Sequence, residues 1–446
     1  MVPAPMPASV EPPAAVALTA AEQRAVIARV TRRLVAFAFL CYVVAYVDRV
    51  NIGFAAAALQ RDLRLDDTAY GLGGGLFFLG YCLFEIPSNL LLERIGARRW
   101  IARIMIGWGL VSMATMFVTG AGTFYAARVL LGIAEAGFFP GMVLYLTYWI
   151  PAAERGRTGA LFMIAAPIAI IVGAQASEAL LALDGRGGLA GWQWLFLVEG
   201  APAVVLGLFA LRVLTDRPEG AHWLSGRDRA WLAKTMEDER RARASIGERD
   251  LSAGLRAPKV WRLAGVYFLN TLVTYGVFLW LPKILRDLSG TSGWRLGLLT
   301  SIPFVAALVA MIAIGRHSDR TGERKGHVAA CALTAAAGLI VAASSNGSVT
   351  LLVLGFTLSQ MGQRSVMGVF WTIPPLVLAG PAAAAGIALI NAIGNLGGFV
   401  GPWVMGWLRD TTGGYTGGLL VLAGALVAAA SLVLTIKLSS PGADLD

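Results

Sequence analysis

The sequence predicts an all-α integral membrane protein with twelve membrane-spanning helices in two similar six-helix halves. The first observation is the composition: 57% of the 446 residues are hydrophobic and only 14% are charged, whereas a soluble domain has about 25% charged residues. The second is a series of apolar runs of about 18 residues or more, the length that lets a helix cross a bilayer. The third is a single long polar segment, residues 215–259, which divides these runs six and six.

The predicted spans follow one another with short polar or Gly/Pro-rich breaks. They cover residues 34–56, 71–92, 100–119, 124–149, 158–181, 193–214, 260–285, 295–315, 327–345, 349–372, 382–406 and 416–438. The chain therefore divides into a disordered tail (1–33), an N-terminal bundle (34–214), a central loop (215–259), a C-terminal bundle (260–438) and a short tail (439–446).

The distribution of basic residues predicts the orientation of the spans. The N-terminal tail is rich in Pro and Ala and lacks the charged start and apolar core of a cleaved signal peptide. The predicted inner loops and tails hold most of the 37 Lys and Arg residues, and such residues favour the cytoplasmic side. We therefore expect both termini, and the central loop, to be cytoplasmic. Within that loop, residues 226–244 could form an amphipathic helix with Trp231, Leu232 and Met236 towards lipid or protein.

Several function classes receive no support from the sequence. The net charge of +10 is spread between the spans and not gathered into one patch, as nucleic-acid binding would require. The three cysteines lie in apolar segments without CxxC spacing, and the three histidines form no ligand cluster. We expect no metal site, no cofactor and no catalytic residues.

The first span carries two adjacent charges, Asp48 and Arg49, near its middle. A charge at the centre of a membrane helix costs on the order of 3 kcal/mol, so it persists only beside a polar cavity or a partner. Neighbouring residues on a helix point about 100° apart, so the two side chains should face different surroundings. A functional role for this pair and a purely structural one both remain open, and the first is favoured.

The fourth span carries a second pair, Arg128 and Glu135, in an otherwise apolar setting. Seven residues make almost two turns, so both side chains leave the same helix face. Two structural alternatives compete with a functional one: an ion pair that only orders the bundle, and an arginine that reaches towards the membrane surface. Glu85 and Glu199 also lie within spans, and for both we favour a gating or packing hydrogen bond over proton transfer.

Two loops carry related sequences at matching places in the two halves. NLLLERIGARRW follows the second span and GRHSDRTGERKG follows the eighth. The shared acid, base, glycine and second base indicate an internal duplication and a tight turn at the cytoplasmic mouth. This predicted gate comprises Glu93, Arg94, Gly96 and Arg98 in the first copy and Gly315, Asp319, Arg320, Gly322 and Arg324 in the second.

The second copy resembles the loop signature of the major facilitator superfamily, and the first departs from it at Asn89 and Glu93. The runs YVDRVNIGFA, RVLLGIAEAGFFPGMVLYLTYWIP and GWQWLFLVEG are similar to the anion:cation symporter branch of that superfamily, which includes tartrate, galactonate, glucarate and phthalate transporters. The resemblance implies the major facilitator fold and a proton-coupled transporter of a small organic anion, in a bacterial inner membrane.

The resemblance also implies roles for individual residues. Protons would occupy Asp48 and Glu135, because related symporters use acids at these positions, and the anion would bind Arg49 or Arg128. Neutral amides and aromatic rings of the second half suit the hydroxyl groups of a ligand, although such residues also pack helices together. The remaining predicted substrate-binding residues are Tyr46, Tyr81, Gln175, Tyr275, Arg364, Trp371, Asn391 and Asn395. For Arg364, which has no acid in its own span, a third cation of the anion site is favoured, and pairing towards the outer vestibule stays open.

Two other functions stay open. An exporter or antiporter of amphipathic or aromatic acid compounds would share the fold. An integral membrane enzyme would need a metal, nucleophile or cofactor motif that the spans lack. The expected partners are protons, the lipid bilayer and one small organic anion, and a single chain is sufficient for the fold.

Overall fold

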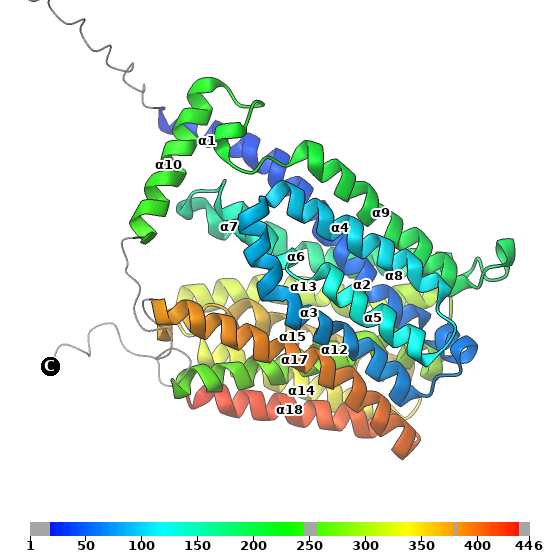
Figure 1. Ribbon diagram of the computed structural model, residues 1–446. Coiled ribbons are helices and arrows are strands. Elements are labelled where there is room, and N and C mark those ends of the chain that lie inside the picture. The colour runs from blue at the N-terminus through cyan, green and yellow to red at the C-terminus, as the bar shows by residue number, and fades with distance from the viewer. Residues whose placement is uncertain (1–17, 245–256, 379–380, 437–446) are drawn as a thin grey trace, which may run out of the picture.

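The computed structural model describes residues 18–244, 257–378 and 381–436. Within these ranges the regular secondary structure is helical throughout, and the long helices run side by side as a bundle (Figure 1). This confirms the predicted all-α fold class. The predicted C-terminal tail, residues 439–446, and the first 17 residues lie outside the described residues.

The N-terminal half contains the first six spans. Its helices are α1 (Ala20–Val30), a π-helical turn (Thr31–Val35), α2 (Ala36–Leu63), α3 (Asp67–Ile95), α4 (Ala97–Ala114), α5 (Ala121–Glu135), α6 (Phe138–Thr147), α7 (Ala152–Met163), α8 (Ala165–Leu181) and α9 (Gly191–Val213). The central segment contains α10 (Gly226–Ala244).

The C-terminal half contains the other six spans. Its helices are α12 (Pro258–Ser289), α13 (Trp294–Thr321), α14 (Lys325–Ala343), α15 (Val349–Phe370), the short α16 (Pro374–Val377), α17 (Pro381–Thr412) and α18 (Thr416–Leu434). Ten stretches of the described chain are long and apolar enough to cross a membrane. The predicted fifth and tenth spans are not among them: α8 has only 17 residues, and α15 carries Gln360, Gln363 and Arg364, which lower its hydropathy.

The structure corrects the extent of the N-terminal tail. Residues predicted to be disordered up to position 33 are helical from Ala20 onwards, and they run without a break into α2. Thr19 begins this helix as an N-cap: its side chain accepts a hydrogen bond from the Glu22 backbone, and the Glu22 side chain accepts one from the Thr19 backbone. Several spans also extend beyond their predicted ends, because polar residues continue a helix outside the apolar run.

The helix α10 covers the same side of the molecule as α1. Arg29 of α1 forms an ion pair with Asp228 at 2.7 Å, and Arg155 of α7 pairs with Glu239 at 2.5 Å. Leu232 is fully buried, so the predicted amphipathic helix turns this apolar residue towards protein. On the exposed face, hydrogen bonds from Arg240 and Arg241 lower the pKa of Glu237 to about 2.

The two halves meet along three helix pairs, α3 with α17, α8 with α13 and α2 with α12. Glycines allow α3 and α17 to approach closely: a Cβ on Gly71 would meet the carbonyl oxygen of Pro402, and one on Gly75 would meet that of Phe399. We call the side that carries α1, α10 and both ends of the described chain the terminal side, and the opposite side the far side (Figure 1).

Candidate functional site

The centre of the site is an ion pair between the first and fourth spans. Arg49 of α2 donates a hydrogen bond from Nε to Oε1 of Glu135 at 2.9 Å, and its Nη2 contacts the same oxygen. The Glu135 side chain is almost completely buried and Arg49 is only slightly exposed. The guanidinium of Arg49 also lies 5.5 Å from the ring of Tyr46 and 5.3 Å from the ring of Tyr81, so cation–π contacts add to its support.

A break in the fourth span places Glu135 at a helix end. The helix α5 ends at Glu135, and α6 begins at Phe138. Gly137 between them has φ +82°, a conformation that favours glycine, and a Cβ there would collide with Ser88 of α3. The carbonyl end of a helix carries partial negative charge. Glu135 and this helix end together therefore create a strong preference for a cation such as Arg49.

Asp48 faces a different part of the N-terminal half, as the sequence predicted. Its Oδ1 accepts hydrogen bonds from Asn51 at 3.2 Å and from the Ser112 hydroxyl on α4. Its Oδ2 is buried and has no hydrogen-bond partner. Asp48 therefore has neutral direct partners, and its side chain is as buried as that of Glu135.

Arg128 completes the predicted group of four charges without touching the other three. Its guanidinium lies 5.2 Å from the ring of Phe77, and its Nε is buried without a hydrogen-bond partner. It remains close enough to Asp48 and Glu135 to interact with both electrostatically. The alternative of an Arg128–Glu135 ion pair is not what the structure shows, because Glu135 pairs with Arg49.

A third buried acid, Glu199 of α9, lies beyond Asp48. The Ser177 hydroxyl of α8 donates a hydrogen bond to Glu199 Oε1 at 2.8 Å, and Oε2 is buried without a partner. Asn51, which donates a hydrogen bond to Asp48, also lies near Glu199. The structure thus gives Glu199 the packing hydrogen bond favoured from the sequence.

The C-terminal half contributes one cation and a set of neutral groups. The guanidinium of Arg364 lies over Phe304 at 5.4 Å and Phe278 at 5.9 Å, and it has no acidic partner within the described ranges. Tyr275 packs on Phe78 of α3 with ring centroids 4.1 Å apart, so it lies where the halves meet. Trp371 makes an edge contact with Tyr267 at 5.0 Å.

Two predicted substrate-binding amides are hydrogen-bonded across the halves. Asn391 and Asn395 of α17 donate to the two carboxylate oxygens of Glu85 on α3, at 3.0 and 3.3 Å. Gln175 lies elsewhere, where α8 meets α13 beside Gly297. In this conformation the amide groups of Asn391 and Asn395 are therefore hydrogen-bonded to Glu85, and Gln175 lies in the contact between α8 and α13.

The two copies of the repeated loop lie at the terminal side, one in each half. In the second copy Arg324 forms an ion pair with Asp319 at 2.8 Å and donates to Ser318. In the first copy the backbone N–H of Arg98 donates to Asp216 at 2.8 Å. Over the described part of the chain no ion pair joins one copy to the other, so pairing of these loops across the mouth stays a prediction.

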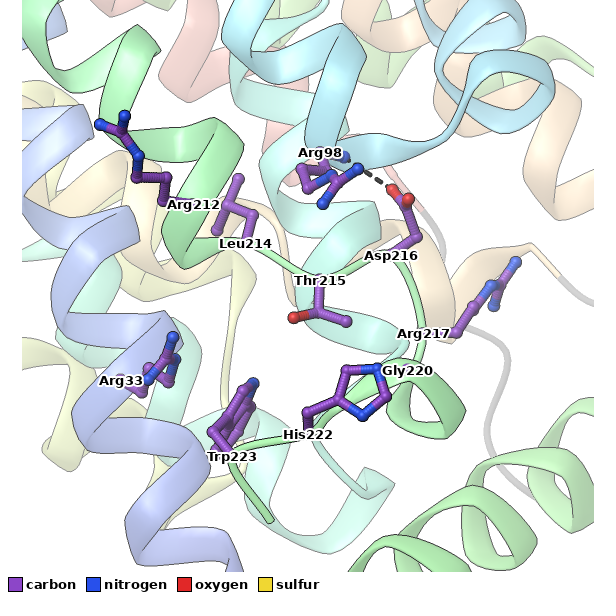
Figure 2. A pocket seen from close by; sticks show the side chains of 10 residues that line it. All are labelled: Arg33, Arg98, Arg212, Leu214, Thr215, Asp216, Arg217, Gly220, His222 and Trp223. Carbon is purple, nitrogen blue, oxygen red and sulfur yellow. Dashed lines mark hydrogen bonds between the residues drawn. The ribbon is translucent and has the colours of Figure 1, made fainter.

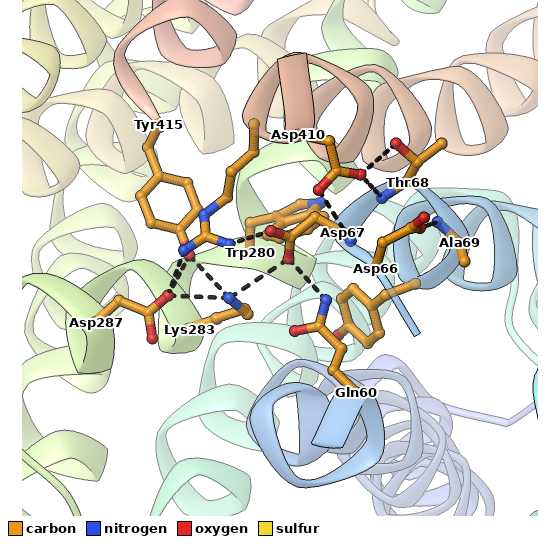
Figure 3. Close-up of polar contacts among 12 residues, drawn as sticks. Gln60, Asp66, Asp67, Thr68, Ala69, Trp280, Lys283, Asp287, Asp410 and Tyr415 are labelled. Atoms are coloured by element: carbon orange, nitrogen blue, oxygen red, sulfur yellow. Dashed lines mark hydrogen bonds and ion pairs between the residues drawn. The ribbon is translucent and has the colours of Figure 1, made fainter. Parts of the chain in front are cut away.

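The far side holds a polar network that joins the halves and that sequence reasoning missed (Figure 3). Asp67 at the start of α3 pairs with Lys283 of α12 at 3.4 Å and with Arg409 of α17. Asp287 of α12 accepts from Lys283 at 2.9 Å, and Tyr415 donates to it at 2.6 Å. We call these five residues the far-side latch.

Two further contacts reinforce this closure. Asp410 of α17 accepts hydrogen bonds from the backbone N–H and the hydroxyl of Thr68 on α3, at 2.7 and 2.5 Å. Glu178 of α8 pairs with Arg286 of α12 at 2.7 Å and accepts from the backbone of Gly293 at 2.8 Å. The only sequence signal for these contacts was the presence of charged residues near span ends, which is too common to predict partners.

Comparison with known proteins identifies the family. The profile of the Major Facilitator Superfamily matches residues 38–402. The chain belongs to the Major Facilitator Superfamily. A protein of Agrobacterium vitis named "Putative tartrate transporter" is 49% identical over 94% of this chain and 92% of its own. A protein of Acinetobacter baumannii named "Quinolone resistance transporter" is 41% identical over 93% of this chain and 94% of its own.

The fold agrees with solved structures of this superfamily. The xylose transporter XylE of E. coli, in a partially occluded inward-open conformation, superposes with a TM-score of 0.73 and 15% identity, covering 93% of this chain and 99% of that one. At this identity the likeness shows the fold. As a member of the Major Facilitator Superfamily, the protein is a multi-pass membrane transporter of small molecules and not an enzyme, and its relatives confirm the resemblance seen in the sequence.

Proposed function

We propose that the protein imports an organic anion together with protons, and that the anion is a sugar acid or a dicarboxylate such as tartrate or galactonate. The observation that carries the proposal is the buried pair of Arg49 and Glu135. A guanidinium offers a two-pronged site for a carboxylate, and here a carboxylate of the protein itself occupies that site.

The charge balance of this pair links the anion to a proton. While Glu135 is ionised, it neutralises Arg49 and competes with a substrate carboxylate. When Glu135 takes up a proton, Arg49 is left as an uncompensated cation in a nearly water-free setting, which is costly until an anion arrives. The substrate then restores neutrality, so that proton and anion enter the site together.

Asp48 supplies a second proton site in the proposal. Its direct partners are neutral and its Oδ2 has none, while Arg128 lies within electrostatic reach. A proton on Asp48 would leave Arg128 free to bind a second carboxylate, which suits a dicarboxylate. Arg364, Tyr275 and Trp371 would meet the rest of the substrate from the other half.

Alternating access provides the transport step. We assign the terminal side to the cytoplasm, because Lys and Arg concentrate there, and the membrane to the bacterial inner membrane. The far-side latch then closes the outer face in this conformation. In the opposite conformation the latch would separate, and the residues of the predicted gate, Glu93, Arg94 and Arg98 with Asp319, Arg320 and Arg324, would come together.

Uptake into proteoliposomes tests the proposal. With the outside buffer acidified, labelled tartrate or galactonate should accumulate inside against its gradient. Glu135→Gln and Asp48→Asn should lose this proton-driven accumulation and still exchange internal for external substrate, because exchange needs no net proton movement. Asp238→Asn on the exposed face of α10 is the matched control and should accumulate normally. Accumulation that persists in the Glu135→Gln, Asp48→Asn double variant would contradict the proposal.

A second candidate function is export or antiport of amphipathic or aromatic acids. The relative named as a quinolone resistance transporter favours it. The same vesicles distinguish the two functions. With the outside acid, protons that enter through an antiporter would drive the compound out of the vesicle, whereas a symporter would carry its substrate in. Extrusion of a quinolone without accumulation of any sugar acid would select this candidate.

A further inference from the structure

A basic cavity opens at the terminal side of the N-terminal half, away from the ion pair of Arg49 and Glu135. Its volume is about 580 Å³, and it lies between the start of α4, the end of α9 and the loop that follows α9 (Figure 2). Four arginines line it: Arg33, Arg98, Arg212 and Arg217. We call it the arginine cavity. Of its four arginines, only Arg98 has a part in the proposed transport cycle, as a residue of the predicted gate.

The arginines of this cavity lack acidic partners. The one carboxylate in the lining, Asp216, accepts a hydrogen bond from the backbone N–H of Arg98 at 2.8 Å (Figure 2). Within the described ranges no guanidinium of the four forms an ion pair. Arg98 Nε is buried and has no hydrogen-bond partner at all. The cavity therefore has four cations and one carboxylate, and that carboxylate already accepts a hydrogen bond from the backbone. This leaves an excess of positive charge and guanidinium N–H groups that can donate to a ligand.

Aromatic rings hold two of the arginines in place. The guanidinium of Arg33 lies 5.1 Å from the ring of Trp223, and that of Arg217 lies 3.7 Å from the ring of Tyr148. Trp223 in turn stacks on the fully buried Trp149 at 5.7 Å. The positive charge is therefore held by packed side chains from the N-terminal half and the central segment, and this fixed arrangement suits a ligand with several negatively charged oxygens.

The surroundings of the cavity indicate where such a ligand comes from. Arg212 is near the end of α9, and the turns before it expose Leu208, Phe209 and Leu211. An exposed apolar helix face is the surface that a membrane protein offers to lipid tails. A ligand with acyl chains along α9 and a negatively charged head in the cavity would satisfy both parts of this surface.

We propose that the arginine cavity binds the phosphate head group of an anionic phospholipid. With the orientation proposed above, this lipid belongs to the inner leaflet. Free inorganic phosphate has the same head-group chemistry but no tails, so its affinity should be far lower. The binding site would fix the loop around Asp216 and, through the Arg98 backbone, the first copy of the repeated loop.

Binding to the purified full-length protein tests this proposal without any transport measurement. We would measure the affinity for phosphatidylglycerol, phosphatidylcholine and inorganic phosphate in detergent, by native mass spectrometry and thermal shift. Phosphatidylglycerol should bind at least about tenfold more tightly than phosphatidylcholine, and millimolar phosphate should not displace it. The double variant Arg33→Gln, Arg212→Gln should lose this preference.

Matched controls separate a specific site from general surface charge. Arg295→Gln with Arg316→Gln removes the same charge from exposed positions outside the cavity and should bind phosphatidylglycerol like the unaltered chain. The melting temperature without lipid shows whether each variant is folded, and the single variant Arg212→Gln serves if the double variant is not. Three results would each overturn the assignment. They are an equal loss of phosphatidylglycerol binding in the two double variants, no preference of the unaltered chain for phosphatidylglycerol over phosphatidylcholine, and displacement of the lipid by millimolar phosphate.

Discussion

Arg49 of α2 and Glu135 of α5 are 86 residues apart in the sequence and share an ion pair in the middle of the N-terminal half. Both Nε and Nη2 of the arginine donate hydrogen bonds to the same carboxylate oxygen, Oε1 of Glu135. The other oxygen, Oε2, is buried without a hydrogen-bond partner. The pair is therefore asymmetric, and one oxygen of Glu135 is available for a proton.

Replacement of Arg49 by lysine should weaken substrate binding. Lysine keeps the charge but lacks the planar fork that binds a carboxylate with two hydrogen bonds. We expect KM for the transported anion to rise about tenfold or more, equivalent to the loss of one charge-assisted hydrogen bond, and Arg49→Ala to abolish saturable uptake. Arg61→Lys, at an exposed ion pair on the far side, should leave KM unchanged. An unaltered KM in Arg49→Lys would remove Arg49 from the binding site.

Replacement of Glu199 by glutamine should leave transport nearly intact. Its partner in the structure is the Ser177 hydroxyl, and an amide of the same shape can accept that hydrogen bond. Glu199→Leu, in contrast, removes the acceptor and leaves Ser177 buried without a partner, which costs on the order of 1–3 kcal/mol. Uptake rate and thermal stability measure both effects. Loss of proton-driven uptake in Glu199→Gln, with exchange retained, would instead make Glu199 a proton site.

Neutralisation of Asp67 should open the far side. Asp67→Asn removes the charge that pairs with both Lys283 and Arg409, so these two cations of the C-terminal half lose the ion pairs that join them to α3 of the N-terminal half. We expect a cysteine placed at Ser301, which packs against α8, to react faster with an impermeant maleimide added from the far side, in a chain without its three native cysteines.

The matched control for this latch is Asp62→Asn. Asp62 also lies on the far side, but its partners Arg61 and Trp192 belong to the same half. It should leave the labelling rate at Ser301 unchanged. Equal labelling in Asp67→Asn and the unaltered chain would show that the latch does not hold the halves together.

Alanine at Gly75 should disturb the contact between α3 and α17. The added Cβ would meet the Phe399 backbone, which cannot move aside as a flexible side chain can. Overpacking of this kind costs about 1–3 kcal/mol, and it should reduce both the melting temperature and the transport rate. Gly107→Ala on α4 has open space around its Cβ and should change neither. A normal transport rate in Gly75→Ala would argue that the two helices separate freely.

Much of the fold could be read from the sequence because the physical constraint is local. Each span must satisfy its own backbone hydrogen bonds in lipid, so a continuous apolar run predicts a helix regardless of its neighbours. The apolar runs do not predict the break in the fourth span after Glu135, because hydropathy is insensitive to a change in backbone direction. Gly137 and Pro140 were its signals: glycine adopts the positive φ, and proline is tolerated in the first turn of the new helix, α6.

The site was less accessible to sequence reasoning. The ionisable residues of the spans could be found one by one, since each is costly in lipid. Their partners could not. The spacing of Arg128 and Glu135 fits an ion pair along one helix, yet Glu135 pairs with Arg49. Asn391 and Asn395 stay predicted substrate-binding residues, and their hydrogen bonds to Glu85 in this conformation could not be foreseen from the sequence.

The sequence by itself determined that this protein crosses the membrane repeatedly, that it consists of two related halves, and that buried charges gather in the first and fourth spans. Only the tertiary structure decided which charge neutralises which, and that the halves are joined by ion pairs at the far side. The reason is that hydropathy is a sum over neighbouring residues, whereas an ion pair depends on how helices distant in the sequence pack and turn towards each other.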